Sequence, residues 1–468
     1  MDGLECSEIQ FSDIDLGDRI DSEYYTKNYI HISDQLSKVN TDKLGNMVSI
    51  VASAFYPAAT HLYSEGNIPF ARCVDCVSYP IITADQDNKF EKIPLKFGEE
   101  NKGISFIKKN EIIITKVGTP CYASILTDYE EIALSRTVLG LTHINHIEPN
   151  YLMIFLRCKY GFEQLFRQRE LTIQYQLTLP RVRAIDVYLA GLELQQVINH
   201  LCSTSKDLRQ KSNSLYYQSE NILMSYIGVN DIANNNTWTI QSYNKSYEKT
   251  GRLDAEYYQP KYDLIVSSLN TKETLESICN LYDENYLPDE EKYYRYIELA
   301  NVGGFGEITD AGSIVGEELP TRARRIVKSG QVIVSSIEGS LQSCALITDE
   351  FDGAICSTGF YVVDSDKLSS ETLLVLFKSE AIQELLKQRC SGTILTSINK
   401  DEFLSLPLPK IDEDIQAKIS EQIKESFALR RKSKQLLEDA KRAVEIAIEQ
   451  DEESAIEWLK DRKKEAGV

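Results

Sequence analysis

Two stretches of the chain, about 193 to 227 and about 412 to 465, repeat apolar side chains at helical spacing over many turns. The residues that set this spacing are Leu201, Leu208 and Leu215 in the first stretch, with Val197 and Leu223 nearby, and Ile415, Ile419, Ile423, Phe427, Leu437 and Val444 in the second. Recurrence every four or seven residues places such side chains in one stripe, which is typical of helices that pair. We predict two long helices that pair with each other; the alternative is two surface helices, each packed on its own domain.

Each long helix closes a segment with the same order of elements. A β-rich stretch comes first, and a short amphipathic helix follows it at 150 to 169 and again at 370 to 389. We therefore expect an α+β fold in which two mixed α/β domains alternate with two long helices.

The order of elements is the same because the sequence itself repeats. RIDSEYY at 19 to 25 returns as RLDAEYY at 252 to 258, and FEQLFRQR at 162 to 169 pairs without a gap with IQELLKQR at 382 to 389. The further matches, in order, are PFARCVD (69 to 75) with YRYIELAN (294 to 301), KKNEIIITKVG (108 to 118) with VKSGQVIVSSIEG (327 to 339), and SILTD (124 to 128) with ALITD (345 to 349). RIDSEYY and RLDAEYY are called the two heads below, and FEQLFRQR and IQELLKQR the two helical octapeptides. The two heads lie further apart in sequence than the two octapeptides do, so the loops between these motifs differ in length between the copies.

The repeat sets the predicted domain boundaries. These are a first domain at 1–190, a first helix at 191–228 with Gly228 as its C-cap, a polar linker at 229–250, a second domain at 251–410, and a second helix with an acidic tail at 411–468. A chain of 468 residues has room for about two to four hydrophobic cores.

Composition and charge refine this picture. The N-terminus MDGLECSEIQ lacks the basic start of a signal peptide and no apolar run approaches a membrane span, so we expect a cytoplasmic protein whose ten cysteines are reduced. The net charge of −20 argues against a nucleic-acid partner. Acidic residues crowd into 283–292 and 449–458, however, whereas RARRIVK at 322–328 is purely basic among its charges. The surface can therefore be positive locally.

The chain lacks the usual signs of catalysis. No glycine-rich stretch ends in a phosphate-loop Gly-Lys-Ser/Thr, and the nearest candidate, NVGGFGE at 301–307, is interpreted as a turn between strands. There is no NPPY or DPPY tetrapeptide, and the five histidines show no metal spacing. Cys73 and Cys76 form a CxxC without a second pair, so we expect two small half-buried side chains on a strand instead of a zinc site. The protein is predicted to recognise or to scaffold and not to be an enzyme.

The text CSGTILTSINKDEFLSLPLPKIDEDIQAKISEQI at 390–423 resembles a signature of the specificity subunits of type I restriction-modification systems. In that family a Ser-Gly-Thr turn precedes a short helix, a Leu-x-Leu-Pro strand and a Gln-containing start of a long helix. Ser391-Gly392-Thr393, Leu406-Pro407-Leu408-Pro409 and Gln416 hold those places here. The two heads and the two lysine, turn, strand, glycine elements resemble those of the family's target recognition domains.

The first half departs from the pattern of the family. DVYLAGLELQQVI at 186–198 lacks the prolines, and RELTIQYQ at 169–176 replaces the Ser-Gly-Thr turn, which puts the loop geometry of the first domain in doubt. The helix start is expected at Gln196, which lies as far before Gln416 as FEQLFRQR lies before IQELLKQR.

The resemblance implies a DNA-binding protein. Each recognition domain would bind one half of a bipartite double-stranded DNA target, and the two helices would pair antiparallel as a spacer; the first, about 35 residues long, would span about 50 Å. Two modification (adenine-N6 methyltransferase) subunits would dock, and they, not this chain, would use S-adenosylmethionine. The sequence leaves open whether restriction subunits join. The alternative is a scaffold or acidic decoy that engages modification subunits without DNA.

Candidate DNA contacts are the cationic and amide side chains that loops could present to the major groove. In the first domain they are Lys108, Lys109, Arg167, Arg169, Gln174, Gln176, Arg181 and Arg183. In the second domain they are Arg322, Arg324, Arg325, Lys328, Arg389, Thr393, Ser397 and Lys400. The tyrosine pairs of the heads could stack on bases, but we favour an anchoring role with the ring in the core and the hydroxyl in water.

Overall fold

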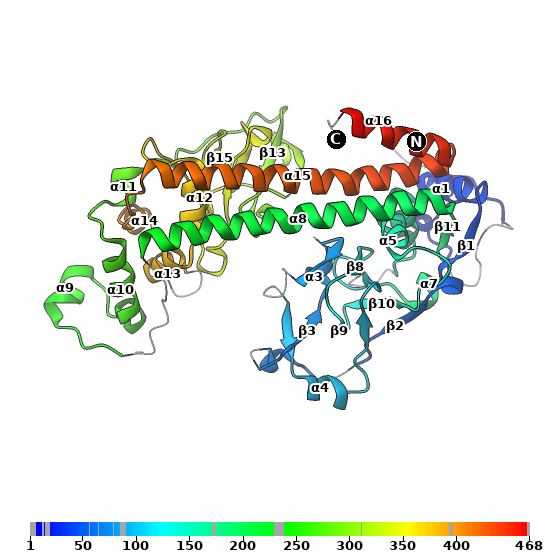
Figure 1. Ribbon diagram of the computed structural model, residues 1–468, viewed down its shortest axis with the longest axis horizontal. Helices are drawn as coiled ribbons and strands as arrows, with labels where there is room; N and C mark the ends of the chain where they lie inside the picture. The colour runs from blue at the N-terminus through cyan, green and yellow to red at the C-terminus, as the bar shows by residue number, and fades with distance from the viewer. Residues whose placement is uncertain are drawn as a thin grey trace. The chain divides into compact units, whose positions relative to one another are not determined.

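The computed structural model describes residues 6–465, apart from 12–13, 15–18, 56, 64, 78, 85–89, 171–174, 229–237, 310 and 393–395. The chain divides into two compact units. Unit 1 comprises Met1–Gln210 and Arg431–Val468, and unit 2 comprises Lys211–Arg430. Figure 1 shows two long helices, α8 (Leu192–Ile227) and α15 (Glu413–Glu449). Each contributes one part to either unit, so the boundary between the units crosses both of the predicted long helices.

Unit 1 contains two main sheets. The inner sheet has the order β2-β10-β7-β8-β4, with β2 Ser49–Ala52, β10 Val138–Thr142, β7 Ile112–Thr115, β8 Ala123–Leu126 and β4 Ile81–Ile82. The outer sheet has the order β5-β3-β9-β6, with β5 Glu91–Ile93, β3 Ile68–Ala71, β9 Glu131–Leu134 and β6 Phe106–Lys108. A two-stranded pair joins β1 (Thr41–Lys43) to β11 (Asp186–Tyr188). The shorter helices are α1 Lys27–Ser37, α2 Leu44–Met47, α3 Cys73–Val77, α4 Leu95–Glu100, α5 Pro149–Arg157, α6 Lys159–Arg167, α7 Leu179–Arg183 and α16 Glu452–Glu465.

Unit 2 repeats this arrangement. Its inner sheet has the order β12-β19-β16-β17, with β12 Asn280–Tyr282, β19 Phe360–Asp364, β16 Val332–Ser335 and β17 Cys344–Leu346. Its outer sheet has the order β14-β13-β18-β15, with β14 Ser313–Val315, β13 Tyr293–Ile297, β18 Ile355–Ser357 and β15 Ala323–Ile326. The shorter helices are α9 Tyr247–Thr250, α10 Pro260–Leu269, α11 Leu275–Ile278, α12 Ser370–Lys378, α13 Glu380–Arg389 and α14 Lys400–Leu404.

The two units share strand order and strand direction, which confirms the predicted internal repeat. In each outer sheet one pair is parallel, β3 with β9 and β13 with β18, while the neighbouring pairs are antiparallel. Strand β4 is the one addition to unit 1 among the strands of the four main sheets that the structure describes. The fold is therefore α+β, built twice on one plan.

Alternation along the central inner strand explains the layers. In β7 the side chains of Ile112 and Ile114 join the core beneath helix α5, whereas Ile113 joins the core shared with the outer sheet. In β16, Val332 and Val334 face helix α12 in the same way, and Ile333 faces the other side. Successive residues of a strand point to opposite faces, so a continuous apolar run buries both faces of the inner sheet.

The predicted pairing of the long helices is confirmed, but its buried seam contains more serine than expected. In unit 1, Ser205 and Ser433 hydrogen-bond through their hydroxyls at 2.9 Å. In unit 2, Ser212 bonds to Ser426 at 2.9 Å, and Ser219 donates to the Gln422 side chain, so the helices run antiparallel there. Serines 205, 212 and 219 are buried, while the predicted Leu208 and Leu215 are only half-buried.

The second long helix ends earlier than predicted. Helix α15 stops at Glu449, and α16 begins at Glu452. The Asp451 carboxylate accepts a hydrogen bond from the Ser454 backbone N–H at 2.8 Å, which is the chemistry of an N-cap. Because an N-cap residue leaves helical geometry, the chain turns at this point instead of continuing the helix.

The ten cysteines are all free thiols in this structure. Cys73 and Cys76 lie on helix α3, not on a strand as predicted, with Cys76 buried and Cys73 half-buried. Within the described ranges, no group of three or more potential ligands gathers in metal-binding geometry. Among the same residues, no helix combines the length and the apolar character needed to cross a membrane.

Candidate nucleic-acid interface

The head of the first copy forms a clasp. The Arg19 guanidinium donates to both oxygens of Asp21, at 2.6 and 2.9 Å, and to the Arg169 carbonyl at 3.0 Å. The Tyr25 hydroxyl donates back to the Arg19 carbonyl at 3.0 Å. The hydrogen bond from Arg19 lowers the pKa of Asp21, so the carboxylate stays charged. The clasp ties the head to the end of helix α6.

The head of the second copy makes the same kinds of contact, although the last guanidinium bond starts from a different nitrogen and ends one residue further along. Arg252 donates to Asp254 at 2.9 and 2.6 Å and to the Cys390 carbonyl at 3.0 Å. The Tyr258 hydroxyl donates to the Arg252 carbonyl at 2.9 Å. The predicted placement of these tyrosines, with the ring in the core and the hydroxyl in water, is wrong in part. Tyr25 is buried, but Tyr24, Tyr257 and Tyr258 are only half-buried, and the hydroxyls of Tyr25 and Tyr258 bond to backbone instead of water.

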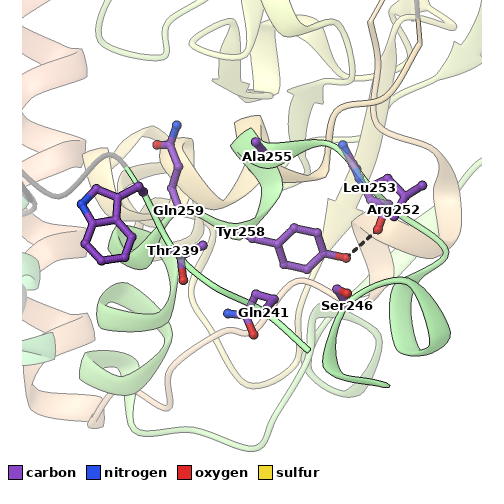
Figure 2. Close-up of a pocket in the computed structure, with 9 residues that line it drawn as sticks. Thr239, Gln241, Ser246, Arg252, Leu253, Ala255, Tyr258 and Gln259 are labelled. Carbon is purple, nitrogen blue, oxygen red and sulfur yellow. Dashed lines mark hydrogen bonds between the residues drawn. The ribbon is translucent and has the colours of Figure 1, made fainter. Parts of the chain in front are cut away.

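A hollow of about 330 Å³ lies beside the second head. Figure 2 shows the Tyr258 side chain in this hollow, with its hydroxyl directed at Arg252. Trp238, which also lines it, is 68% exposed. Because its other lining side chains are mostly uncharged and the one guanidinium is held by Asp254, the hollow offers little to attract a phosphate.

Two candidate lysines occupy equivalent turns. Lys108 and Lys328 are both exposed, and each directs its backbone N–H to the side chain three residues later, to Glu111 at 2.7 Å and to Gln331 at 2.8 Å. The left-handed residue of the turn is Asn110 in the first copy and Gly330 in the second. Lys109 extends the first turn and is also exposed.

The loops that carry Gln176 and Ser397 are equivalent as well. Gln176 forms isolated β-bridges with Glu170 and Val117, and Ser397 forms them with Ser391 and Ile337. The same two bridges therefore close the ends of the Ser-Gly-Thr loop in unit 2 and of the corresponding loop in unit 1, although the sequence of the first copy differs. Candidates Gln174 and Thr393 lie outside the described residues.

The three arginines of the predicted basic run differ in their surroundings. Arg322 is exposed, but it donates to the Glu298 carboxylate at 2.8 Å and to the Tyr296 hydroxyl at 3.2 Å. Arg324 is half-buried and donates to the Thr321 carbonyl at 3.0 Å. Acidic and aromatic groups thus accompany the predicted basic run.

Arg325 and Lys400 meet at one segment of unit 2. The Arg325 guanidinium donates to the Tyr282 carbonyl at 3.3 Å, and the Lys400 ammonium pairs with Asp283 at 2.6 Å. The hydrogen bond from Lys400 lowers the pKa of Asp283, with a further contribution from Arg325. The structure thus brings together two candidates that are distant in sequence.

Two other candidates are embedded in the protein. Arg389 is 9% exposed, donates to the Leu385 carbonyl at 3.0 Å, and has its pKa lowered by burial. Arg167 donates to the Tyr24 carbonyl at 2.7 Å and lies over the Tyr24 ring at 4.0 Å; burial lowers its pKa too. Arg167 therefore holds the end of α6 to the first head, whereas Arg389 is buried and bonded within its own helix α13.

The remaining candidates lie in unit 1. Arg169 lies over the Phe166 ring at 3.0 Å and the Tyr175 ring at 4.2 Å. On helix α7, Arg183 is exposed and Arg181 is half-buried. Whether any of the sixteen side chains touches DNA stays a prediction.

The glutamine at the start of each long helix corrects one sequence inference. Gln416 accepts from the Ser369 N–H at 2.8 Å and donates to the Ile411 carbonyl at 2.9 Å. Its counterpart is Gln195, which accepts from the Glu148 N–H at 2.9 Å and donates to the Ala190 carbonyl at 2.7 Å. The predicted equivalent, Gln196, was wrong by one position, because the offset between the copies is larger by one here than at the preceding helical octapeptides.

The prolines of the Leu-Pro-Leu-Pro run have a structural counterpart without proline. The Leu275 N–H donates to the Leu406 carbonyl at 2.8 Å, and in unit 1 the Leu44 N–H donates to the Ile185 carbonyl at 2.8 Å. Since proline lacks an N–H, unit 2 shows a single bridge from Thr274 to Pro407 where unit 1 has the β1–β11 pair.

Comparisons with known proteins give structural neighbours only. No protein-family model matches the chain, and no curated protein matches it. The chain is similar to the type I restriction-modification S subunit from M. genitalium, at 12% identity and a TM-score of 0.36, over 89% of this chain and 95% of that one. It is also similar to the HsdS subunit from Thermoanaerobacter tengcongensis, at 13% identity and a TM-score of 0.30, over 88% and 97%. Both TM-scores are below 0.5, so a function has to be argued from this chain's own residues.

Proposed function

We propose that the protein is a sequence-specific DNA-binding subunit of a type I restriction-modification complex. Each unit binds one half of a bipartite target, the paired helices α8 and α15 act as the spacer, and two modification subunits dock on the repeat. The chain itself contributes recognition, and the modification subunits contribute S-adenosylmethionine-dependent adenine methylation.

The internal repeat is the observation on which this proposal rests. Two units with the same strand order, the same parallel strand pair and a similar head clasp are two equivalent domains, which supports two equivalent binding modules. A protein that recognises two separated half-sites needs two such modules and a rigid connection between them. The motif order at 390–423 supports the same conclusion, because it places the turn, strand and helix start of the specificity-subunit signature in sequence.

The candidate contacts differ in accessibility. Lys108, Lys109 and Lys328 are exposed at equivalent turns, and Arg322 and Lys400 are exposed in unit 2. A cation already paired with a carboxylate must exchange that partner for a phosphate, so Arg322 and Lys400 would bind DNA with less gain than the turn lysines. Arg167 and Arg389 are proposed to act through the fold alone.

The genome-wide pattern of 6-methyladenine tests the proposal. A host expressing the chain together with a modification subunit should methylate one bipartite motif. Replacement of Lys211–Arg430 by the corresponding part of a different specificity subunit should change one half of the motif and leave the other half unchanged. A motif that changes in both halves, or a continuous motif, would contradict two independent modules.

A scaffold without DNA contacts is the second candidate, favoured by the charge. The chain carries −20, and two of its exposed candidate cations are paired with Glu298 and Asp283. A purified complex of the chain with modification subunits that fails to bind DNA of the host genome, at low salt, would support the scaffold and reject the specificity subunit.

A further inference from the structure

Arg209 and Arg430 occupy equivalent places in the two long helices. They are separated in sequence by the same interval as the helix starts Leu192 and Glu413. Each guanidinium turns toward the globular part of its own unit and meets the segment that follows the parallel strand of the outer sheet, β3 in unit 1 and β13 in unit 2. Neither residue is among the sixteen candidate DNA contacts.

In unit 2 the segment is the glycine-rich turn at 301–307, closed by a bridge between Val302 and Ile308. Phe305 at its tip is 7% exposed and belongs to the core that the long helices share with the inner sheet. Its ring lies edge-on to Tyr216 and Tyr217 of α8, at 5.2 and 5.6 Å between centroids. The turn thus reaches from the outer sheet to the helix pair.

Arg430 closes this contact from the other helix. Its guanidinium lies 4.4 Å from the centre of the Phe305 ring, pairs with the Glu307 carboxylate at 3.1 Å, and donates to the Asn213 side chain. The Arg430 and Glu307 side chains are 15% and 18% exposed, so solvent screens the pair weakly. A flat cation stacked on a ring and paired at its edge fixes both distance and orientation.

Gly306 of this turn is required by its backbone conformation and by the fit against α12. Gly306 has φ +86°, and a Cβ there would lie 2.5 Å from a Leu374 methyl carbon of α12. A Cβ on Gly303 would lie 2.3 Å from the Glu307 carboxyl carbon. Close approach, and not phosphate binding, therefore explains the glycine-rich sequence of this turn.

Unit 1 holds its own segment through Arg209. The guanidinium donates to the Ile81 carbonyl at 2.6 Å and to the buried Thr83 hydroxyl at 2.7 Å. Lys206 and Gln210, on the same helix, both bind Asp128, which lies on the loop between β8 and β9. The partners differ from those in unit 2, and Ile81 belongs to strand β4 of the inner sheet, but in both units an arginine of the helix pair holds the segment that follows the equivalent outer-sheet strand.

We propose that Arg209 and Arg430 are positioning residues that fix the globular part of each unit on the helix pair, through the edge strand β4 of the inner sheet in unit 1 and through the turn of the outer sheet in unit 2, and thereby set the spacing between the two DNA half-sites. This inference rests on the proposed function. Adding one base pair to a spacer moves the second half-site by about 3.4 Å and turns it by about 34° to 36°. A recognition domain that is fixed both by its connection to the long helices and by the arginine contact cannot rotate to reach the moved half-site. A domain that has lost the arginine contact can.

The contact of Arg430 with Phe305 and Glu307 is called the clamp below. The first test measures this clamp in the absence of DNA. Hydrogen exchange of the purified full chain should be at least about tenfold faster at the amides of Gly303–Glu307 in Arg430→Ala than in the parent chain. Arg431→Ala is the matched control, because Arg431 is exposed and makes no ion pair with any residue within the described ranges. Unchanged exchange in Arg430→Ala would overturn the clamp, whatever the chain binds.

The second test measures spacing. In the methylation assay, Arg430→Ala should modify sites whose spacer is one base pair longer or shorter, in addition to the parent motif, with both half-site sequences retained. Arg209→Ala should do the same, and Lys211→Ala, at an exposed surface ion pair, should not. If Arg430→Ala shows faster hydrogen exchange at Gly303–Glu307 but methylates only sites with the parent spacer length, Arg430 does not set the spacing between the half-sites. Absence of any bipartite methylation by the parent chain would instead reject the proposed function, and the exchange result would still decide the clamp.

Arg430→Lys separates positioning from a general loss of stability. Lysine keeps the charge but loses the planar fork that stacks on Phe305 and pairs with Glu307 at once. We expect relaxed spacing in this variant too, at a chain stability close to that of the parent. Parent-like spacing in Arg430→Lys would show that charge alone is needed and would contradict the proposed role of orientation.

Discussion

At the scale of single residues, equivalent positions of the two copies make the same hydrogen bonds even where the surrounding sequence differs. Gln195 and Gln416 make the same two kinds of hydrogen bond at the start of their helices. The sequence contains two adjacent glutamines, Gln195 and Gln196, and an ungapped alignment selects the wrong one. The hydrogen-bond partners decide, because only one of two neighbouring helical positions faces the preceding segment.

The clasp of the second head gives a prediction at this scale. The hydrogen bond from Arg252 lowers the pKa of Asp254 below its ordinary 3.8, so the carboxylate contributes stability above that pH and loses it as the pH falls through the lowered value. Asp254→Asn should therefore be less stable than the parent at pH 7, by about 0.5 kcal/mol, because the Asp254 side chain is 46% exposed and solvent weakens the ion pair. Urea unfolding across pH 7 to 3 should show the difference shrinking toward acid. A difference that is constant with pH would exclude the ion pair as its source.

At the scale of elements, the apolar period predicted the helix pair, but not its seam. Ile419, Ile423, Phe427 and Val444 are buried as the pattern indicated. On α8, Leu201 and Leu223 are buried as expected, but serine hydroxyls take the place of Leu208 and Leu215 in the seam. Serines 205, 212 and 219 also recur every seven residues, and a small hydroxyl can bond across two closely spaced helices. Periodicity alone cannot separate two parallel stripes on one helix when both have the same spacing.

Substitution of the seam tests its packing. Ser212 is fully buried and bonds to the Ser426 hydroxyl, so Ser212→Leu forces a larger side chain between the helices and should lower the free energy of unfolding by about 1 to 3 kcal/mol. Ser214→Leu, on the exposed face of the same helix, should stay within about 0.5 kcal/mol of the parent. Chemical denaturation measures both. Equal effects of the two variants would mean that the hydroxyl pair is not a packed contact.

The glycine-rich turn provides a second element for testing. Gly306→Ala places a side chain at φ +86° and against Leu374, so it should destabilise the protein by more than about 1 kcal/mol. Gly312 has nothing within 4 Å of an added Cβ, and Gly312→Ala should be nearly neutral. Thermal unfolding of the two variants compares the positions directly. A neutral Gly306→Ala would show that the turn does not press against α12.

At the scale of the whole molecule, the sequence predicted the twofold plan because the plan is written in the order of short motifs. It did not predict that each long helix belongs partly to one unit and partly to the other, since that depends on contacts between residues far apart in sequence. The basic run at 322–328 was visible in sequence, but the partners of Arg322 and Arg325 come from other strands and loops. The basic run in the sequence therefore suggested more unpaired positive charge at the surface than the structure has, since Arg322 and Arg325 bond to other parts of unit 2.

The turn lysines give the last prediction, which concerns the independence of the two units. If Lys108 and Lys328 each contact one phosphate, each alanine variant should flatten the slope of log K against log salt by about 1. Because the residues lie in different units and share no partner, the losses in binding free energy should add in the double variant to within about 0.5 kcal/mol. Fluorescence anisotropy of the complex with its modification subunits on target DNA measures both quantities, with the exposed Lys96→Ala and Lys292→Ala as controls. A double variant that loses no more than either single variant would mean that the two lysines do not contact DNA through separate modules, since one shared contact would then account for both losses.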